Sequence, residues 1–445
     1  MTDTPSPGVE LLWAALGGDS ALTRHIVYGG PRGLLPARLP VMELARATVA
    51  VCSLAAAERS ASLSGDPVPA VRVDDGAVAT AFVSERHLRV DGRAPVSFAP
   101  LSRFWRATDG WVRTHANYPH HRAALLTALG TTEDGVESAI AERSALDVED
   151  AVYQAGGLAV ALRTPGEWAA HPQGALAARQ PLLTRDRLDD AAPRRRRAEG
   201  RLRVLDLTRV IAGPVATRTL ALLGSDVLRI DPPRLPELAD QHADTGFGKR
   251  SAALDLDNAA DRRTFDELLD QADVLVTGYR PGALERHGLM RPGLVVAQLS
   301  AWGDEGPWGD RRGFDSLVQV ASGIAVLEGS IEQPGTLPAQ ALDHGTGYLL
   351  AAAVLRSLTE QDTEGGTRLL RLALARTAHL LSGVLPRRPV DAPAAYTPDA
   401  WLAESASPLG KLRYACSPVA YEGSPADWSR PPGTWGSDAP EWLTA

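Results

Sequence analysis

The chain has 445 residues, a formal net charge of −8 and a hydrophobic content of 44%. This length allows two or three domains with sizeable cores. The acidic balance argues against a nucleic-acid partner, whose binding surface normally concentrates Lys and Arg. The two cysteines, Cys52 and Cys416, form no CxxC pair, and no His/Cys spacing suggests a metal site. Because the N-terminus lacks a signal-peptide or membrane-spanning pattern, we expect a cytoplasmic protein with no membrane partner.

The first half of the chain reads as two units that precede a linker. Residues 1–89 read as a mainly helical segment, with a buried Ala- and Leu-rich helix over 42–63 and possible strands at 71–73 and 78–82. Residues 90–190 read as a small α+β domain, in which Asp109-Gly110 between aromatic residues predicts a hairpin. The arginine run at 194–197 after Pro193 reads as a solvated linker.

A strand–turn–helix–strand pattern occupies residues 202–231. An apolar run at 204–207 is broken by Ala212-Gly213-Pro214; helical spacing follows to Gly224, and a second apolar run covers 227–230. Two strands joined through one helix are almost always parallel. Further strands at 254–256, 274–276 and 294–299 predict a doubly wound, mostly parallel, Rossmann-like sheet in a large domain at 200–385. Ligands of such sheets bind beyond the carboxyl ends of the strands.

The remaining residues predict two apolar helices, at 313–327 and 345–358, and a buried element at 369–381. A C-terminal tail, 386–445, reads as largely irregular. Residues 34–82 and 335–381 share an order, Leu-Pro-Ala, an Ala-rich helix, a polar turn and an apolar element, which suggests a decayed duplication.

Several loops of the predicted sheet could receive an anion. Pro214 stands where the first residue of a helix would, so free amides at that helix start face the mouth of the sheet. Lys249, Arg250, Arg280 and Arg286 follow or precede strands and would suit phosphate groups. The alternatives are an ordinary buried βαβ unit and surface cations that pair with Asp and Glu.

Asp343 is the residue with two competing interpretations. It lies in Ala341-Leu342-Asp343-His344-Gly345, at the entry to an apolar helix. A carboxylate in that position can cap the helix by accepting amide hydrogen bonds. Held beside glycines that admit a bulky substrate, it can also act as a nucleophile.

A resemblance to the class III CoA-transferases, the group of formyl-CoA transferase and carnitine CoA-transferase, rests on five ordered blocks. The blocks are VLDLTRVIAGPVATRTLALLGSDVLRID, GKRSAALDL, ADVLVTGYRPGALERHGL, SAWGDEGPWGDRRGFDSLVQVASGI and ALDHGTGYLLAAAVLRSL. The resemblance implies that coenzyme A binds as an acyl-CoA substrate, with no metal. It also implies that Asp343 attacks the thioester, forms an acyl-aspartyl anhydride and then an aspartyl-CoA thioester, and passes CoA to a carboxylic acid.

The same resemblance implies the CoA contacts. They would be Val210, Ile211, Ala212, Lys249, Arg250, Gly278, Tyr279 and Arg286, with Arg286 at the adenine-phosphate end. Gly278 replaces a position that is often Asn in the family. Members of the family form interlocked dimers, so we expect a homodimer.

The chain departs from the family in its order of domains. The segment that resembles the family's small domain precedes the large domain, as in a rearranged chain or two fused copies.

Two functions other than CoA transfer are the alternatives. An α-methylacyl-CoA racemase would need a second proton acceptor, and the Gly313-Phe314-Asp315 block has Phe where such racemases have His. A catalytically inactive acyl-CoA-binding protein is the other.

Overall fold

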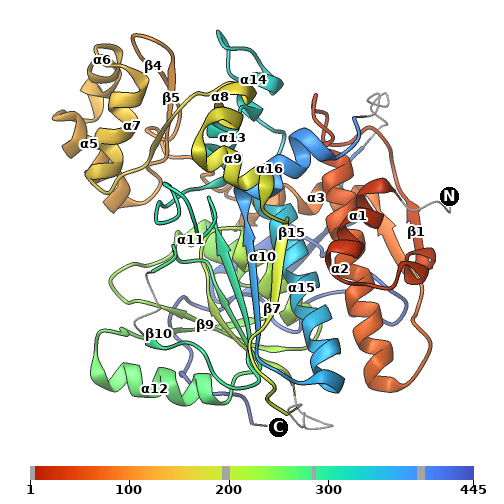
Figure 1. The fold of residues 1–445 in the computed structure, drawn as a ribbon. Coiled ribbons are helices and arrows are strands. Elements are labelled where there is room, and N and C mark those ends of the chain that lie inside the picture. The colour runs from red at the N-terminus through yellow and green to blue at the C-terminus, as the bar shows by residue number, and fades with distance from the viewer. Residues whose placement is uncertain (1–5, 193–200, 283–286, 388–395, 445) are drawn as a thin grey trace.

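A seven-stranded sheet forms the centre of the molecule in this computed structural model, which describes residues 6–192, 201–282, 287–387 and 396–444 (Figure 1). Its order is β10-β9-β8-β11-β12-β13-β7. The first six strands pair in parallel, and β7 is antiparallel to β13. The strands are β7 Leu183–Arg187, β8 Arg203–Leu207, β9 Asp226–Asp231, β10 Lys249–Ala253, β11 Val274–Thr277, β12 Val295–Ser300 and β13 Arg368–Ala373. The predicted doubly wound, mostly parallel sheet is confirmed.

Helices cover both faces of this sheet because successive side chains of a strand point to opposite sides. Val204 of β8 belongs to a core shared with α10 (Ala212–Leu222) and α15 (Ala341–Glu364). The next residue, Leu205, belongs to a second core against α12 (Ala259–Asp270). The chain order of the strands reverses between β8 and β11, which opens a crevice where their carboxyl ends diverge.

The N-terminal segment packs against the sheet domain through α2 (Val41–Ser64). It also contains α1 Pro7–Ala15, a 3₁₀ turn Ser20–His25, β1 Ile26–Gly29, β2 Val71–Asp74, α3 Asp75–Ala81, α4 Ser84–His87 and β3 Arg89–Val90. The strand predicted at 78–82 is wrong, because these residues lie in or directly after α3. The Asp74 side chain accepts the Ala77 amide at 2.9 Å and thereby caps that helix.

Helices α2 and α15 lie side by side and run in the same direction. Leu44 faces Gly345 near their starts, and Arg356 pairs with Glu58 near their ends. Both helices have 24 residues. Each leads into a strand and then a short helix: β2 and α3 after α2, β13 and α16 (Leu374–His379) after α15. This shared order supports the duplication, which stays a prediction.

The small domain is built on a three-stranded sheet, at the upper left of Figure 1. The predicted hairpin is confirmed as β4 Phe104–Arg106 and β5 Trp111–Thr114, and β6 Ala159–Ala161 completes the sheet. It carries α5 Pro119–Leu129, α6 Val136–Ala141 and α7 Ala145–Gln154. Two helices, α8 Pro165–Ala170 and α9 Pro172–Arg179, then lead into β7.

The domain boundaries stay predictions, but β7 falls within the predicted small domain and joins the large sheet. Between β9 and β13 lie α11 Ala239–Thr245, α13 Asp315–Ala321 and α14 Ile324–Glu328. The C-terminal part, which was expected to be irregular, contains a hairpin of β14 Leu402–Ser407 and β15 Gly410–Ala415 that extends to β3. Within the described ranges, no helix has the length and apolar character needed to cross a membrane.

Two glycines of α15 give a test of how closely this helix must pack. A Cβ on Gly347 would lie 2.5 Å from the Ala212 carbonyl oxygen and 2.8 Å from the Val215 Cβ, both on α10. The nearest atoms to a Cβ on Gly345 would be those of the Leu44 side chain, at 3.4 Å or more. We expect Gly347→Ala to lose about 1–3 kcal/mol of unfolding free energy through overpacking. Gly345→Ala, the matched control, should be neutral or gain up to about 1 kcal/mol of helix propensity.

Thermal and denaturant unfolding of both variants measure the difference. Equal stability of the two variants would contradict the close approach of α15 to α10.

Candidate functional site

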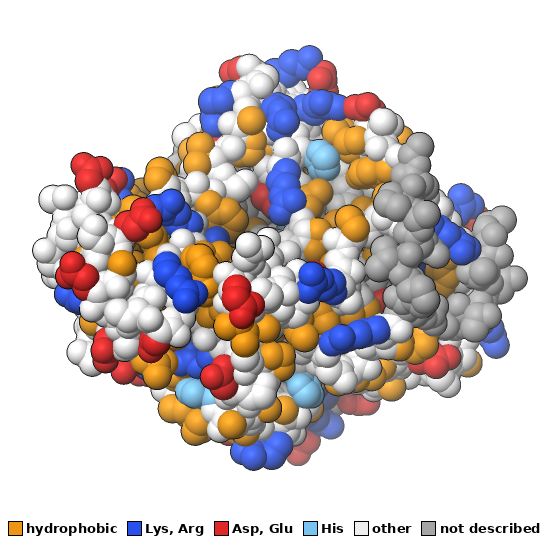
Figure 2. All heavy atoms as spheres, turned by 90° about the horizontal axis from the view of Figure 1, so that it is seen from above, with side chains coloured by type: hydrophobic (Ala, Val, Ile, Leu, Met, Phe, Trp, Pro, Cys, Tyr) orange, Lys and Arg blue, Asp and Glu red, His pale blue; other side chains and the backbone are white. Residues whose placement is uncertain are grey.

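A cavity of about 540 Å³ lies beyond the carboxyl ends of the parallel strands. The loops that follow β8, β9, β11, β12 and β13 line it, and the small domain closes one side with Tyr118, His120 and His121. This is the crevice at which ligands of doubly wound sheets bind. In the view from above, Figure 2 shows cationic and apolar side chains around a hollow on this face. The cavity is therefore the candidate site.

Six of the residues implied by the resemblance meet in this cavity. They are Val210, Ile211, Ala212, Gly278, Tyr279 and Asp343. Arg286 lies outside the described residues. The structure thus brings together the loop before α10, the loop after β11 and the start of α15, three segments far apart in the sequence.

Lys249 and Arg250 do not line the cavity, and the structure corrects their expected position. The Lys249 Nζ donates to Asp206 Oδ2 at 3.0 Å and to Thr217 Oγ1 at 2.6 Å. Burial lowers the pKa of Lys249 to about 8, against the attraction of Asp206. Arg250 forms a two-pronged ion pair with Asp226. Both cations are buried and neutralised, so they support the sheet where a phosphate contact was expected.

Five arginines line the cavity instead, and they differ in their partners. Three have carboxylate partners: Arg209 with Glu237, Arg234 with Asp255 and Asp257, and Arg311 with Glu149 and Asp150. Arg280 and Arg312 form no ion pair with any residue that the structure describes. Arg280 opposes the charge on Arg312, whose pKa is lowered first by burial and then by this repulsion. Two unpaired guanidinium groups in one cavity form a site for an oxyanion.

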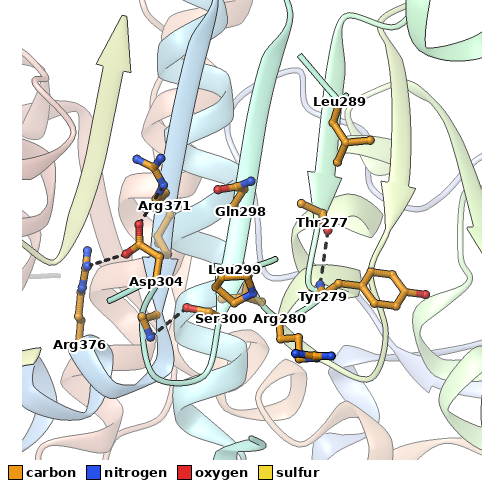
Figure 3. Close-up of a pocket in the computed structure, with 14 residues that line it drawn as sticks. Thr277, Tyr279, Arg280, Leu289, Gln298, Leu299, Ser300, Asp304, Arg371 and Arg376 are labelled. Atoms are coloured by element: carbon orange, nitrogen blue, oxygen red, sulfur yellow. Dashed lines mark hydrogen bonds and ion pairs between the residues drawn. The ribbon is translucent and has the colours of Figure 1, made fainter. Parts of the chain in front are cut away.

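A narrow recess adjoins the cavity and shares Tyr279, Arg280, Leu299 and Ser300 with it. In Figure 3, Asp304 lies between Arg371 and Arg376, and Arg280 makes no marked contact with the residues drawn. The ion pairs of Asp304 measure 3.2 Å to Arg371 and 3.7 Å to Arg376. Arg371 and Arg376 are therefore neutralised within the protein, and Arg280 is not.

The loop before α10 is held in a strained conformation. Val210 has a φ of +69°, which is unfavourable for a β-branched residue. Its amide donates to Glu237 Oε2 at 3.1 Å, and the same carboxylate accepts from Arg229 at 2.9 Å. Burial opposes the charge on Glu237, but Arg229 and Arg209 lower its pKa to about 2. Tyr118 of the small domain donates its hydroxyl to the other oxygen.

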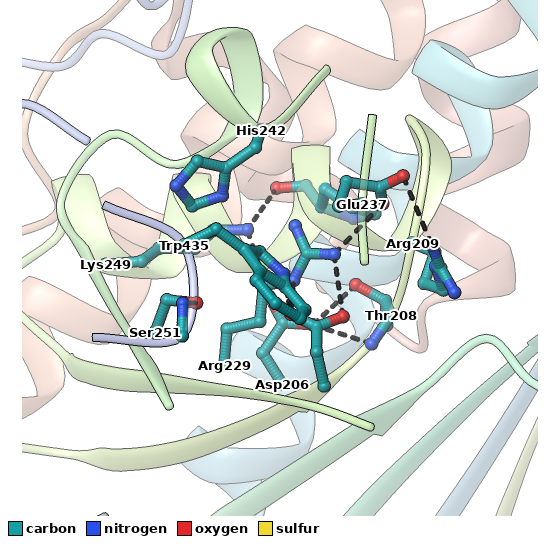
Figure 4. A network of polar contacts seen from close by, with 12 residues as sticks. Asp206, Thr208, Arg209, Arg229, Glu237, His242, Lys249, Ser251 and Trp435 are labelled. Atoms are coloured by element: carbon teal, nitrogen blue, oxygen red, sulfur yellow. Dashed lines mark hydrogen bonds and ion pairs between the residues drawn. The ribbon is translucent and has the colours of Figure 1, made fainter. Parts of the chain in front are cut away.

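Figure 4 shows Arg229 at the centre of this network, between Glu237 and the residues around Asp206. Asp231 accepts from Arg229 and also from the indole of Trp435 at 3.0 Å. The network is fully buried at Arg229 and Glu237. Because Tyr118 belongs to the small domain, it also fixes that domain against the strained loop.

Asp343 is the third residue of α15, and the residue is 6% exposed. Its amide donates to Asp315 Oδ2 at 2.9 Å, and the Leu342 amide also binds Asp315. The N-cap residue, Gln340, makes no capping hydrogen bond with its side chain. Asp315 therefore supplies the hydrogen bonds that a cap would supply, and Asp343 lines the cavity.

The electrostatic surroundings of Asp343 disfavour its charged form. Burial, followed by the charges of Asp315 and Glu85, raises the pKa of Asp343 well above its usual range. Burial also raises the pKa of Asp315 to about 6. A carboxylate that ionises only at a raised pKa is a stronger base and nucleophile than an ordinary one.

Sequence reasoning missed Glu85 and the partner it has beside Asp343. The carboxylate of Glu85, on α4, lies 3.4 Å from Nε2 of His344, which is fully buried. Burial of Glu85 would raise its pKa, but the neighbouring His344 outweighs this effect and the pKa is lowered. No local pattern marked this pair, because it joins the N-terminal segment to α15. Arg311 and Arg312, by contrast, directly precede Gly313-Phe314-Asp315 in a sequence block that carries the resemblance. The sequence could therefore have identified them as site residues.

Comparisons with known proteins point to one family. The profile of CoA-transferase family III matches residues 200–386. The probable fatty acyl-CoA transferase Rv3272 of Mycobacterium tuberculosis is 32% identical over 193 residues, 39% of this chain and 49% of that protein. The formyl-CoA:oxalate CoA-transferase of Rhodopseudomonas palustris is 30% identical over 205 residues, which are 41% of this chain and 46% of that protein. The acetyl-coenzyme A transferase nodX of Hypoxylon pulicicidum is 34% identical over 180 residues, which are 37% of this chain and 30% of that protein.

This chain therefore spans about half, or less, of the length of these relatives. A crystal structure of Rv3272 matches with 33% identity and a TM-score of 0.38, over 40% of this chain and 53% of that one.

The raised pKa of Asp343 predicts a pH-dependent cost to stability. The folded chain retains the Asp343 proton to a higher pH than the unfolded chain, so stability is lost as pH rises above about 3.9. Asp343→Asn removes the charge, and its amide can donate to Asp315. We expect the variant to be more stable than the parent by about 0.5–2 kcal/mol at pH 8, and by less at pH 4.

Melting temperatures across this range measure the effect. Asp134→Asn, the same change at an exposed position, is the control. A stability difference between Asp343→Asn and the parent that does not grow with pH would contradict the raised pKa.

Proposed function

We propose, from the membership of residues 200–386 in CoA-transferase family III, that this protein transfers CoA from an acyl-CoA to a carboxylic acid. One observation carries the proposal: Asp343 lines the same cavity as the strained loop at Val210 and as Arg280 and Arg312, which have no ion-pair partner among the described residues. A nucleophile and an oxyanion site in one crevice match what an acyl-CoA requires.

In the proposed reaction, a carboxylate oxygen of Asp343 attacks the thioester carbonyl and CoA leaves as a thiolate. The product is an acyl-aspartyl anhydride. The thiolate then attacks the aspartyl carbonyl, which releases the first carboxylate and leaves an aspartyl-CoA thioester. An acceptor carboxylate attacks that thioester to give a second anhydride, and the thiolate takes the acceptor acyl group. Asp343 is regenerated as a carboxylate, and no other reactant is consumed.

The protein's own residues have distinct roles in this scheme. Asp315 holds the backbone of Asp343 through its amide and keeps the carboxylate at the cavity wall. In this proposal the amides at the start of α10, around Ala212, and the guanidinium groups of Arg280 and Arg312 bind the phosphates of CoA; all of these residues line the cavity. The small domain covers this position with Tyr118, His120 and His121.

The homodimer and the cytoplasmic location remain parts of this proposal.

One observation favours the racemase-like alternative. His121 lines the cavity with Asp343, and its Nδ1 has no hydrogen-bond partner within the described residues. Burial lowers the pKa of His121 to about 2, which keeps its imidazole neutral but makes it a weak base, so the geometry favours this alternative and the electrostatics count against it. An α-methyl acyl-CoA incubated in deuterated water without an acceptor separates the two reactions, because a racemase exchanges the α-proton and a transferase does not.

The nucleophile is tested by Asp343→Asn. We expect CoA transfer to fall at least about a thousandfold, because no carboxylate remains to attack the thioester. Glu43→Gln is the matched control: Glu43 is the third residue of α2, as Asp343 is of α15, but it accepts the Gly8 amide and does not line the cavity. It should retain transfer. Near-parental turnover of a folded Asp343→Asn would remove the covalent mechanism and favour the alternatives.

The assignment of Arg280 and Arg312 to the phosphates of CoA is tested by Arg280→Gln and Arg312→Gln. Each should weaken CoA binding by about tenfold, or about 1.4 kcal/mol, and the loss should shrink at high salt. Arg263→Gln, the same change on the exposed face of α12, is the control. Calorimetric titration with CoA measures the affinity. Unchanged affinity in both pocket variants would refute their assignment to the phosphates.

A further inference from the structure

A short helix of the N-terminal segment, α4, is anchored to the large domain beside the start of α15. Ser84 donates its hydroxyl to Asp244 Oδ2 at 2.8 Å, and Arg218 of α10 donates to the Ser84 hydroxyl at 3.3 Å. Phe82, which precedes α4 and is fully buried, packs on the imidazole of His344 with ring centroids 5.3 Å apart. Contacts with α10, α11 and α15 therefore fix the position of α4.

Glu85 is the residue of α4 that this anchoring brings to α15. Its Oε2 atom lies 3.4 Å from Nε2 of His344, and both atoms are shielded from solvent. Burial would raise the pKa of Glu85, but His344 outweighs burial and the pKa is lowered, so this carboxyl is charged at neutral pH. The pair joins a charged side chain of the N-terminal segment to the residue that directly follows Asp343.

Asp343 is a second group on which the charge of Glu85 acts. Both Asp343 and His344 lie in the first turn of α15. Burial raises the pKa of Asp343, and the charges of Asp315 and Glu85 raise it further. Glu85 is not part of the described lining of the cavity, so its effect reaches the cavity through Asp343.

Other charged or titratable groups surround Glu85, on α4 itself and on the elements packed near it. They are Arg86, His87, Arg218, Asp244 and Asp315. Asp315 acts on Asp343 in the same direction as Glu85. A test of Glu85 must therefore leave these groups in place and change the charge at position 85 alone.

We propose that Glu85 is a positioning residue for the nucleophile: its carboxylate, held on His344, fixes the first turn of α15 and places a negative charge near Asp343. The inference rests on the proposed function and assigns part of the active site to the N-terminal segment, outside the matched residues 200–386. A like charge disfavours ionisation of a neighbouring carboxyl and makes its ionised form more nucleophilic. Glu85 therefore lowers the activity at low pH and increases the reactivity of Asp343 at higher pH.

Glu85→Gln tests this role because it keeps the shape of the side chain and removes its charge. The nucleophile must be ionised to attack, so the acidic limb of a plot of kcat/KM against pH reports the ionisation of Asp343 coupled to Asp315. Without the charge at position 85, Asp343 ionises at a lower pH. We expect the ratio of kcat/KM at about pH 5.5 to that at about pH 8.5 to rise at least about threefold. Glu85→Asp retains the charge and should stay closer to the parent ratio.

Glu58→Gln is the matched control. Glu58 also belongs to the N-terminal segment and also pairs with a buried side chain of α15, Arg356, but toward the other end of that helix. Its loss should lower the stability of the protein without changing the ratio of kcat/KM between the two pH values. A purely structural role of Glu85 would give this same result in Glu85→Gln.

A double-mutant cycle tests the coupling without a transfer assay. Asp343→Asn is expected to stabilise the parent more at pH 8 than at pH 4. In the Glu85→Gln background this pH-dependent rise in melting temperature should fall by at least about half, because part of the repulsion is already removed. In the Glu58→Gln background it should be unchanged. If Glu85→Gln does not fold, Glu85→Met, which is neutral and of similar length, replaces it in both experiments.

The outcomes separate this inference from the proposed function. A raised pH ratio together with a reduced cycle supports the role of Glu85. If either quantity is unchanged in a protein that transfers CoA, the inference is wrong and the proposed function stands. A parent protein that transfers no CoA would overturn the proposed function, and the role of Glu85 toward a nucleophile with it, whatever the cycle shows.

Discussion

The hydrogen bond from the Asp343 amide to the Asp315 carboxylate connects the two elements on which the site depends. Asp315 begins α13 and receives the start of α15, so it fixes where the carboxylate of Asp343 enters the cavity. The same contact places two acidic side chains close together in a buried environment. Burial raises the pKa of both, and the charges of Asp315 and Glu85 raise that of Asp343 further. The residue that fixes the position of Asp343 therefore also contributes to the raised pKa of its carboxyl group.

Segments outside the family match complete this arrangement. Glu85 of the N-terminal segment reaches His344, beside Asp343. Tyr118 of the small domain reaches Glu237, which holds the strained amide of Val210. The family profile covers 200–386, so each contact joins a residue outside the match, Glu85 or Tyr118, to a residue within it. In a chain whose small domain precedes the large one, the cavity is still lined from both.

The sequence predicts the sheet well because its signals are local. Alternation of residues such as Val204 and Leu205, helical spacing within α10 and α12, and turn residues such as Gly224 each act within a few positions. The prediction of a strand at 78–82 was wrong because it also rested on a local signal. The apolar composition of this segment suits a strand or a helix, and the cap from Asp74 decides for a helix.

The site is predicted less completely, because burial and pairing are not local. Asp343, Val210 and Tyr279 were identified from motif blocks and do line the cavity. Lys249 is neutralised by Asp206, which lies on a different strand, so the glycine-rich loop around it gave a misleading signal. The unpaired state of Arg312 follows from the absence of a carboxylate near it among the described residues, and no sequence pattern carries that information.

The central claim is that Asp343 becomes covalently activated, and peptide mass mapping after hydroxylamine treatment tests it most directly. The protein is incubated with an acyl-CoA, and hydroxylamine then converts an anhydride or thioester of an aspartate into a hydroxamate. The account predicts that the hydroxamate forms at Asp343, depends on the acyl-CoA and is absent from Asp343→Asn. A hydroxamate on another residue, or none during measurable CoA transfer, would contradict it.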